Sequence, residues 1–498
     1  MNKLNRNGLT EEQRSLYEQT KQAPVTVLQI GEGNFLRGFF DWMLHECRKR
    51  GLYEGSVAVT QPRPGGKPKI EALAEQDGLY TLVIRGLENG ESVQRTEVIS
   101  VFREAFDPYS DWDRFLALAE SADLRVVVSN TTEAGLAYRP EELADGQPVQ
   151  SFPGKLTQLL YRRYVHFKGD PARGLICLPC ELLERNGDEL RSCVLRYSDD
   201  WGYPEAFKEW VARHNRFLNS LVDRIVTGYP GGEQAEAWFG EWGYADPMLS
   251  TAEPYHLWAI EAEPALEEIL PLRKAGLNVH WVSDLKPFQL RKVRILNGAH
   301  TLMTPIGLLH GIEQVREAME HGELGPFVRG TVEREIVPSL PIAEEELKQY
   351  AAAVYERFLN PFIRHRLSDI AMNSLSKFKV RLLPSLMHYA GGGEDAPQGL
   401  VRGFAGLLRY YKVKRTEAGF VGETLGGASY AVRDDAGLLE TIAGVWAQAE
   451  ERQWPLEATI GKLLGLASVW GRDLAAEWPE LPSILSKNMT EMERSANE

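Results

Sequence analysis

The sequence has few cysteines and no long hydrophobic run, and both absences narrow the class of protein. Only four cysteines occur in 498 residues, too few for a disulfide framework. Cys177 and Cys180 lack a second Cys pair or a His pair at zinc-ligand spacing, so we expect buried structural thiols and no metal. No segment reaches the roughly 18 uninterrupted apolar residues of a membrane span, and the polar N-terminal segment has no apolar signal core. We expect a cytoplasmic protein that binds no membrane.

Excess positive charge is also missing. Lys and Arg number 56 against 70 Asp and Glu, for a net charge of −14, so no global positive field attracts phosphate backbones, and we expect no nucleic-acid partner. Hydrophobic residues make up 43% and charged residues 25% of the chain, as in soluble globular proteins. The length is about three times that of a usual domain, which predicts at least two domains.

The two halves of the chain differ in their hydrophobic period. Short β-branched runs at residues 25–30, 56–60, 124–129 and 175–180 alternate with helical patterns, which predicts βαβ units and a parallel sheet covered on both faces.

From about Trp201 onward, helical period dominates, as at residues 207–226 and 347–359, and strand-like runs become rare. Turn-rich segments at 228–232 and 391–397 predict surface loops. We therefore expect an α/β protein with a Rossmann-like N-terminal domain over residues 1–275 and a mostly α-helical C-terminal domain over residues 276–498.

A glycine-rich turn follows the first apolar run. Gly31 and Gly33 precede a helical stretch, where small residues let the backbone approach a pyrophosphate and a helix start supplies free N–H groups. Leu36 replaces the third glycine of the GxGxxG pattern, so a plain strand-to-helix turn stays an alternative. No carboxylate follows the second run, where Gln61 and Arg63 flank a proline. The residues therefore leave NAD and NADP both open.

Two further segments carry polar residues suited to ligand binding. Thr131, Thr132 and Glu133 follow the run at 124–129, at a strand end where open α/β sheets place ligands, although an ordinary capped loop would look the same. The segment 285–303 reads as a helix, in which Asn297 lies about 140° and His300 about 80° around from Lys292. Ketone reduction without metal needs a proton donor and a donor that stabilises alkoxide charge, which Lys and Asn supply. A solvated lysine and a core histidine are the alternatives.

Together these motifs resemble the long-chain polyol dehydrogenases, a family that includes mannitol dehydrogenase, fructuronate reductase and tagaturonate reductase. The resemblance spans roughly residues 20 to 480. Its motifs are GxGxFxR at 31–37, a TxTE-like loop at 131–133, KxRxLNGxH at 292–300, NPxxxH at 360–365 and a lysine-containing segment that ends at Lys377.

The resemblance implies a metal-independent, NAD-dependent reaction on a small sugar substrate. Lys292 would exchange the proton, Asn297 would polarise the carbonyl and His300 would position the substrate. Further substrate contacts are implied for Lys377 and His365. The implied cofactor-binding residues are Ile30, Gly31, Glu32, Gly33, Asn34, Phe35, Leu36, Arg37, Thr131, Thr132 and Glu133.

Departures from the mannitol dehydrogenase pattern bear on the substrate. Leu182 stands where those enzymes place a second carbonyl-polarising Asn, and Gln289 stands where they carry a Glu. The segments PCELLERNG, RILNGAHT and NSLSKFKVR are most similar to the hexuronate-reducing members, which implies reduction of D-tagaturonate to D-altronate with NADH. Fructuronate, a neutral polyol and a non-enzymatic NAD sensor remain alternatives, and the oligomeric state stays open. A hexuronate carboxylate calls for a cationic partner, and the unranked candidates are Arg364, Arg366, Lys377, Lys379 and Arg381.

Overall fold

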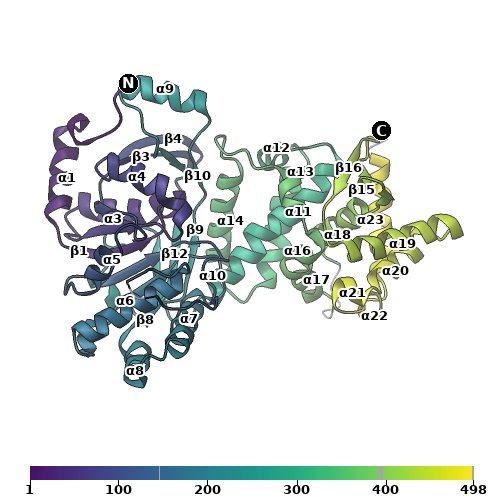
Figure 1. Cartoon of the computed structure of the whole chain (residues 1–498). Helices are drawn as coiled ribbons and strands as arrows, with labels where there is room; N and C mark the ends of the chain where they lie inside the picture. The colour runs from purple at the N-terminus through teal and green to yellow at the C-terminus, as the bar shows by residue number, and fades with distance from the viewer. Residues whose placement is uncertain (145, 391–395, 496–498) are drawn as a thin grey trace. The chain divides into compact units, whose positions relative to one another are not determined.

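The computed structural model describes residues 1–144, 146–390 and 396–495. The chain divides into two compact units: unit 1 comprises Met1–Gly86 and Ser92–Leu285, and unit 2 comprises Leu87–Glu91 and Lys286–Glu498. Figure 1 follows the chain through both units. The division falls after Leu285, about ten residues beyond the domain boundary expected near residue 275. Residues 391–395 of the loop expected at 391–397 lie outside the described residues.

A six-stranded parallel sheet forms the centre of unit 1. Its strand order, β5-β2-β1-β6-β7-β8, is the 3-2-1-4-5-6 order of dinucleotide-binding sheets when its strands are counted along the chain. The strands expected near 25–30, 56–60, 124–129 and 175–180 are confirmed. The six are β1 (Val25–Ile30), β2 (Ser56–Thr60), β5 (Phe102–Ala105), β6 (Val126–Ser129), β7 (Ile176–Pro179) and β8 (Arg216–Phe217).

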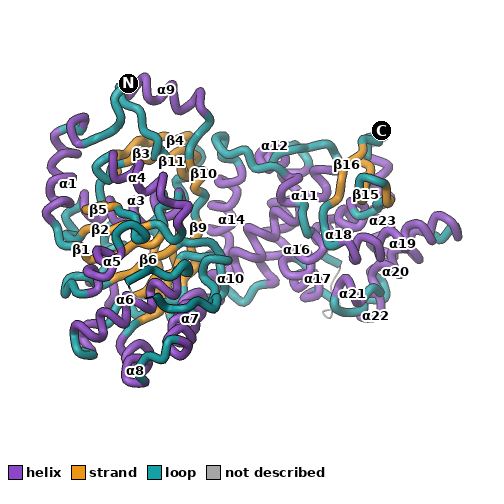
Figure 2. Tube along the Cα trace, in the orientation of Figure 1, coloured by secondary structure: helices purple, strands orange, loops and turns teal. Residues whose placement is uncertain are grey.

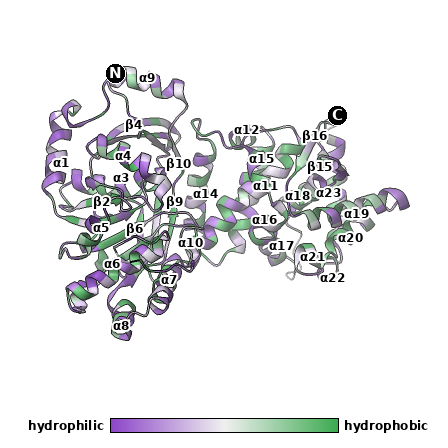
Figure 3. Ribbon diagram, in the orientation of Figure 1, coloured by the Kyte–Doolittle hydropathy of each residue, from purple (hydrophilic) through white to green (hydrophobic). Residues whose placement is uncertain are grey.

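Both faces of this sheet are buried, which explains why its strands read as continuous apolar runs. Val27 belongs to one hydrophobic cluster and its neighbour Leu28 to another, because successive side chains point to opposite faces. Figure 3 shows the apolar residues concentrated along these strands and the inner sides of the helices. The Val27 cluster includes residues of α3 (Phe40–Lys49) and α4 (Lys67–Glu75), and the Leu28 cluster includes residues of α5 (Trp112–Ala119), α6 (Phe152–His166), α7 (Asn186–Asp200) and α8 (Glu205–His214).

Two smaller sheets and three further α-helices also belong to unit 1. One sheet contains β3 (Tyr80–Glu88), β4 (Glu91–Ile99), β10 (Val226–Gly228) and β11 (Ser250–Ala252), with the tip of the β3–β4 hairpin assigned to unit 2. The other contains β9 (Ser220–Asp223), β12 (Leu257–Glu261) and β13 (Val279–Val282). The helices are α1 (Glu11–Gln22), α2 (Asn34–Arg37) and α9 (Gly232–Trp242).

The helix expected over residues 207–226 is wrong beyond its first half. The helix α8 ends at His214, and three strands follow before residue 229. Leu218 and Val222 have helical spacing and are both buried, but β8 pairs with β7 and β9 pairs with β12. Pairing with distant strands therefore overrides the local period, and strands are more frequent after Trp201 than the sequence indicates.

Unit 2 is mostly helical, as expected, and Figure 2 shows few strands in it. The helices α11 (Asn297–Leu309) and α18 (Gln398–Tyr410) pack closely: a Cβ at Gly403 would lie 2.3 Å from Leu302, and one at Gly406 would lie 2.6 Å from Ile306. The helix expected over 347–359 is confirmed by α14 (Glu344–Phe358), which ends one residue earlier. Two segments, Lys292–Leu296 and Val332–Ile336, are π-helical.

The elements of unit 2 are α10 (Lys286–Arg291), α11 (Asn297–Leu309), α12 (Val315–Glu320), α13 (Leu324–Thr331), α14 (Glu344–Phe358), α15 (Leu367–Ile370), α16 (Ser374–Arg381), α17 (Leu383–His388), α18 (Gln398–Tyr410), α19 (Ala436–Arg452), α20 (Leu456–Leu464), α21 (Ala467–Trp470), α22 (Leu474–Glu477) and α23 (Leu481–Ser495), with the antiparallel strands β14 (Lys414–Thr416), β15 (Gly419–Glu423) and β16 (Ser429–Val432).

Two expectations about the whole chain can be compared with the structure. All four cysteines are free and buried, which confirms the structural thiols. Within the described ranges, no helix combines the length and the apolar character that crossing a bilayer requires. The cytoplasmic location stays a prediction.

Candidate functional site

The turn between β1 and α2 has the backbone geometry that its glycines predict. Gly31 has φ +132°, and a Cβ there would lie 2.8 Å from the carbonyl oxygen of Asn130, so no larger residue fits. A Cβ at Gly33 would meet nothing within 4 Å. Gly33 also caps α2 without a side-chain hydrogen bond, which leaves the first N–H groups of the helix without a side-chain acceptor. This open, N–H-rich turn fits a pyrophosphate.

The buried side chain of Arg37 stabilises this turn through hydrogen bonds. Its side chain is 3% exposed, and its guanidinium donates to Glu32 O at 3.1 Å, to Asn34 Oδ1 at 2.7 Å and to the carbonyl oxygen of Met248. Burial lowers the pKa of Arg37. The motif therefore places an arginine behind the glycine turn, where it supports the backbone that a cofactor would contact.

The other residues of segment 30–37 separate into buried and accessible groups. Ile30 and Leu36 are core residues, and Phe35 stacks on Phe39 with ring centroids 4.9 Å apart. Asn34 is half-buried. Glu32 is buried, which raises the pKa of its carboxyl group.

The loop after β6 is fixed by a buried carboxylate. Thr131 donates to Glu181 Oε1 from its backbone N at 2.9 Å and from Oγ1 at 3.0 Å, and Ser129 Oγ donates to Oε2 at 3.1 Å. Burial raises the pKa of Glu181, while these hydrogen bonds act in the opposite direction. Thr132 has φ +85°, a strained conformation for a β-branched residue, and Glu133 is exposed.

Glu181 was missed as a site residue by sequence reasoning. The available signal was a Glu directly after the β7 run, in a chain whose β6 run ends in hydroxyl residues. Because β6 and β7 are neighbours, residues at their carboxyl ends meet at one edge of the sheet.

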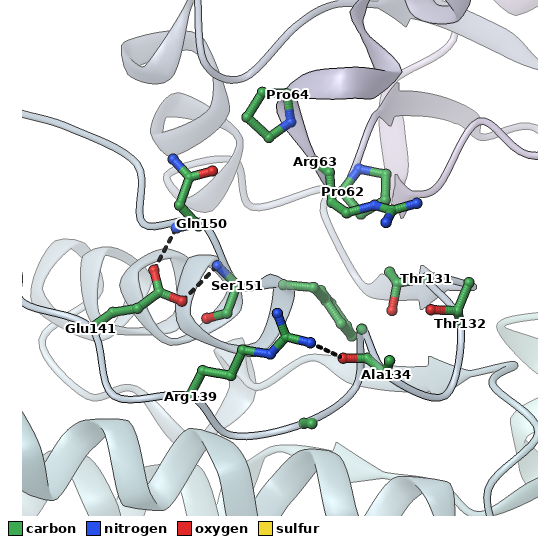
Figure 4. A pocket seen from close by; sticks show the side chains of 13 residues that line it. Pro62, Arg63, Pro64, Thr131, Thr132, Ala134, Arg139, Glu141, Gln150 and Ser151 are labelled. Carbon is green, nitrogen blue, oxygen red and sulfur yellow. Dashed lines mark hydrogen bonds between the residues drawn. The ribbon is translucent and has the colours of Figure 1, made fainter.

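A pocket of about 260 Å³ lies in unit 1 beside these loops. Figure 4 shows Arg63 and Arg139 entering it from opposite sides. Arg139 donates to Ala134 O at 3.1 Å, and Glu141 accepts from the backbone N–H groups of Gln150 and Ser151. The carboxyl ends of the strands next to β1 are where dinucleotide-binding sheets hold their ligand. The lining residues are Pro62, Arg63, Pro64, Thr131, Thr132, Ala134, Gly135, Ala137, Arg139, Glu141, Gln150, Ser151 and Phe152.

Lys155 on α6 links several segments around this pocket through hydrogen bonds. Its side chain is fully buried, and Nζ donates to Pro62 O at 3.0 Å, Tyr109 Oη at 2.8 Å and Gln150 O at 2.8 Å. Burial lowers the pKa of Lys155 to about 7. Sequence reasoning did not single out this lysine, because it lies inside an ordinary helical pattern.

In unit 2, Lys292 and Asn297 lie at the two ends of a π-helical turn. The backbone N–H of Asn297 donates to Lys292 O, the i→i+5 pattern of a π-helix. Asn297 therefore lies about one turn beyond Lys292, and their side chains share a face more closely than α-helical geometry predicts. Both residues are half-buried. Arg291, directly before them, is paired with Glu346 at 2.7 Å.

His300 is buried one turn further along, with 9% of its surface exposed. Its ring lies 4.3 Å from that of Phe358 and 4.8 Å from that of His365. Among the described residues, His300 Nε2 has no hydrogen-bond partner. Burial lowers the pKa of His300 well below its usual value, and the neighbouring His365, Arg357, Arg381 and Lys377 lower it further. The ring is therefore neutral near pH 7.

Lys377 and Arg381 lie one helical turn apart on α16, which packs against α11. Lys377 Nζ donates to Ile370 O at 2.8 Å, and Arg381 Nη1 donates to Thr301 Oγ1 at 3.1 Å, beside His300. The predicted residues of unit 2 thus gather around α11, and those of unit 1 gather at the carboxyl ends of β1 and β6. In the described part of the chain, no three or more His, Cys, Asp or Glu residues are grouped so that they could hold a metal ion.

Comparison with known proteins matches both parts of the chain. Residues 25–274 match the mannitol dehydrogenase Rossmann domain, and residues 284–492 match the mannitol dehydrogenase C-terminal domain. The chain is 42% identical to altronate oxidoreductase of Bacillus subtilis, over 95% of this chain and 92% of the relative. It is 40% identical to altronate oxidoreductase of Halalkalibacterium halodurans, over 96% of this chain and 92% of the relative.

Two solved structures share the fold. A D-sorbitol dehydrogenase in substrate-free form has a TM-score of 0.76 at 20% identity, covering 96% of this chain and 94% of its own. Mannitol 2-dehydrogenase of Pseudomonas fluorescens, in a ternary complex with NAD and D-mannitol, has a TM-score of 0.62 at 21% identity, covering 96% of this chain and 93% of its own. The parallel sheet, the glycine turn and the extent of these matches lead to one conclusion: the chain belongs to the mannitol dehydrogenase family of oxidoreductases that act on CH–OH groups.

Proposed function

We propose that the chain is an NAD-dependent altronate oxidoreductase, which reduces D-tagaturonate to D-altronate with NADH and catalyses the reverse oxidation. The observation that carries this proposal is the 42% identity with an altronate oxidoreductase over 95% of the chain. The half-buried cations on α16 support a substrate that bears a carboxylate. A fructuronate reductase is the alternative.

Two features of unit 1 support NAD binding. Gly31 and Gly33 leave the backbone accessible to a pyrophosphate, and we assign the adenosine half to the pocket of about 260 Å³ beside Thr131 and Arg63. When bound, the nicotinamide supplies the hydride. Arg63 is exposed at the pocket, so affinity for NADPH is to be measured beside affinity for NADH.

Unit 2 carries the acid–base groups. Lys292 in its ammonium form donates a proton to the substrate's carbonyl oxygen as the carbonyl carbon gains a hydride, and the C=O double bond becomes the CH–OH of the product. The Asn297 amide donates a hydrogen bond to the same oxygen and stabilises its developing charge. The neutral His300 ring orients a substrate hydroxyl. In the oxidation direction, Lys292 takes the proton back.

The test is NADH oxidation by the purified protein with D-tagaturonate, D-fructuronate and D-fructose side by side. The proposal expects the highest kcat/KM with tagaturonate. Fastest turnover of fructuronate would establish the alternative, and fastest turnover of fructose would remove the uronate assignment. NADH binding without turnover of any ketohexuronate would instead indicate a sensor.

A further inference from the structure

The five basic residues that the sequence suggests as carboxylate partners differ in exposure and in the residues they contact. Arg364 and Arg366 are exposed. Lys379 reaches Val469 O at 3.4 Å, whereas Arg381 reaches Thr301, the neighbour of His300. Lys377 lies four residues before Arg381, so the two share a face of α16. Only this face combines partial burial with a position beside the predicted catalytic residues.

Arg381 retains most of its hydrogen-bonding capacity. A guanidinium has five N–H donors, and in the described part of the chain Arg381 uses one of them, toward Thr301 Oγ1. Lys377 likewise donates to a single oxygen, that of Ile370. Burial lowers the pKa of both groups. Half-buried cations with spare donors are stabilised by an anionic partner.

Among the described residues, the carboxylates of Asp434 and Asp369 interact with other groups. Asp434 is the acidic group that most influences Lys377, but it accepts from Tyr411 Oη and from the backbone N–H of Leu375. Asp369 acts on His365. The surroundings of His300 are correspondingly cationic, with Arg357, Lys377 and Arg381 all lowering its pKa. Among the described residues, the positive charges of Lys377 and Arg381 on this side of α16 are therefore not paired with a carboxylate.

We propose that Arg381, assisted by Lys377, binds the carboxylate of the substrate and so sets the preference for a sugar acid over a neutral sugar. The proposal rests on the proposed function, because it assumes a hexuronate substrate. The planar guanidinium presents parallel N–H donors that match the two carboxylate oxygens, a geometry that an ammonium group cannot reproduce. Its hydrogen bond to Thr301 holds the guanidinium beside the helix that carries His300.

The test compares D-tagaturonate with D-tagatose, the ketose that carries a hydroxymethyl group in place of the carboxylate. In Arg381→Gln, the ratio of kcat/KM for tagaturonate over tagatose is expected to fall about 10- to 100-fold, mainly through KM, because one charge-assisted interaction is lost. Arg381→Lys is expected to lie between Gln and wild type. Lys379→Gln, on the same helix, is the matched control and is expected to keep the wild-type ratio.

Several results would overturn the proposal. An unchanged ratio in Arg381→Gln, or equal losses with both substrates, would show that Arg381 does not recognise the carboxylate. If Arg381→Gln does not fold, Arg381→Lys decides, since it keeps the charge and loses the paired donors. Absence of uronate turnover in the wild type would remove the proposed function as well, whereas uronate turnover with an unchanged ratio would remove this inference alone.

Discussion

Several buried cations of unit 1 and two half-buried cations of unit 2 differ in how many of their donors the protein uses. In unit 1, Arg163 is 1% exposed and donates to four backbone carbonyl oxygens, of Ala119, Ser121, Leu124 and Arg173. Arg37 and Lys155 are likewise surrounded by oxygens of the protein. In unit 2, Arg381 and Lys377 each donate to one oxygen among the described residues.

This difference separates structural cations from ligand-binding ones. A cation whose donors are all used by backbone oxygens fixes loops and cannot bind a ligand without breaking those bonds. A half-buried cation with spare donors is available to a substrate. Substitutions of the fully engaged cations in unit 1 should therefore lower stability or cofactor affinity, and substitutions of Lys292 and Arg381 in unit 2 should change kinetics first.

The largest effect is expected for Lys292→Ala. Turnover of tagaturonate should fall about 10²-fold or more, because a general acid contributes about 10² to 10⁴, while the Kd for NADH and the melting temperature stay near wild type. Steady-state kinetics and NADH fluorescence titration measure the two properties. Lys379→Ala is the matched lysine control. Turnover that survives the loss of Lys292 would refute its assigned role.

Arg37→Met should, in contrast, lower stability and cofactor affinity. Three oxygens lose their donor inside the core, so the free energy of unfolding should drop by about 3 kcal/mol, and NADH affinity should fall with the loosened turn. Urea denaturation measures the first quantity. Arg14→Met, at an exposed arginine of α1, should change stability by less than about 0.5 kcal/mol. Normal stability with impaired turnover would place Arg37 among the kinetic residues instead.

Lys155→Met should lower stability by about 2 kcal/mol near neutral pH and raise the Kd for NADH about tenfold, because the pocket loops lose their common donor. The deficit depends on pH. Burial lowers the pKa of Lys155 from 10.5 to about 7, so between these values the unfolded chain binds a proton that the folded chain does not. The free energy of unfolding of the wild type therefore rises relative to that of Lys155→Met as pH rises from 7 to 10.5.

Denaturation of wild type and Lys155→Met across this pH range measures the trend. The exposed-pair variant Lys208→Met serves as control, since Lys208 bridges Asp199 and Glu205 at the surface of unit 1. A deficit that shrinks with rising pH would contradict the burial argument.

The smallest effect concerns acid sensitivity. His45 on α3 is 4% exposed, and burial lowers its pKa from 6.5 to about 3. Below pH 6.5 the unfolded chain gains a proton that the folded chain excludes, so stability falls as pH falls toward 3. Between pH 7 and 5.5 this residue should account for about 1 kcal/mol of the loss. In His45→Gln that share should disappear, while the part due to His300 in unit 2 remains. Identical acid profiles would exclude His45 as a source.

Much of the fold was predictable because each buried strand of the central sheet is marked by a short apolar run in the local sequence. The β1 and β2 runs match the structure residue for residue. The helix prediction failed at residues 215–226 because Leu218 and Val222 fit both periods, and only pairing with β7 and β12 decides between them.

The candidate site was predictable through motifs, but its supporting residues were not. Glu181 and Lys155 act through contacts with loops far along the chain, which a single sequence does not display. Arg37 was found by its motif, yet its inward direction depends on Met248, more than two hundred residues away. The spacing of Lys292 and Asn297 was calculated for an α-helix, and the π-helical hydrogen bond changes that angle.

The π-helical turn at Lys292–Leu296 makes the number of residues as important as their identity. Removing any one residue between Lys292 and Asn297 would let the segment relax into an ordinary α-helix, and every side chain beyond it would rotate by about 100° relative to those before it. A designer who transplants these residues onto a regular helix would keep both side chains and lose their alignment. Single-residue insertions and deletions here should therefore be tolerated far less well than substitutions at Val293 or Ile295.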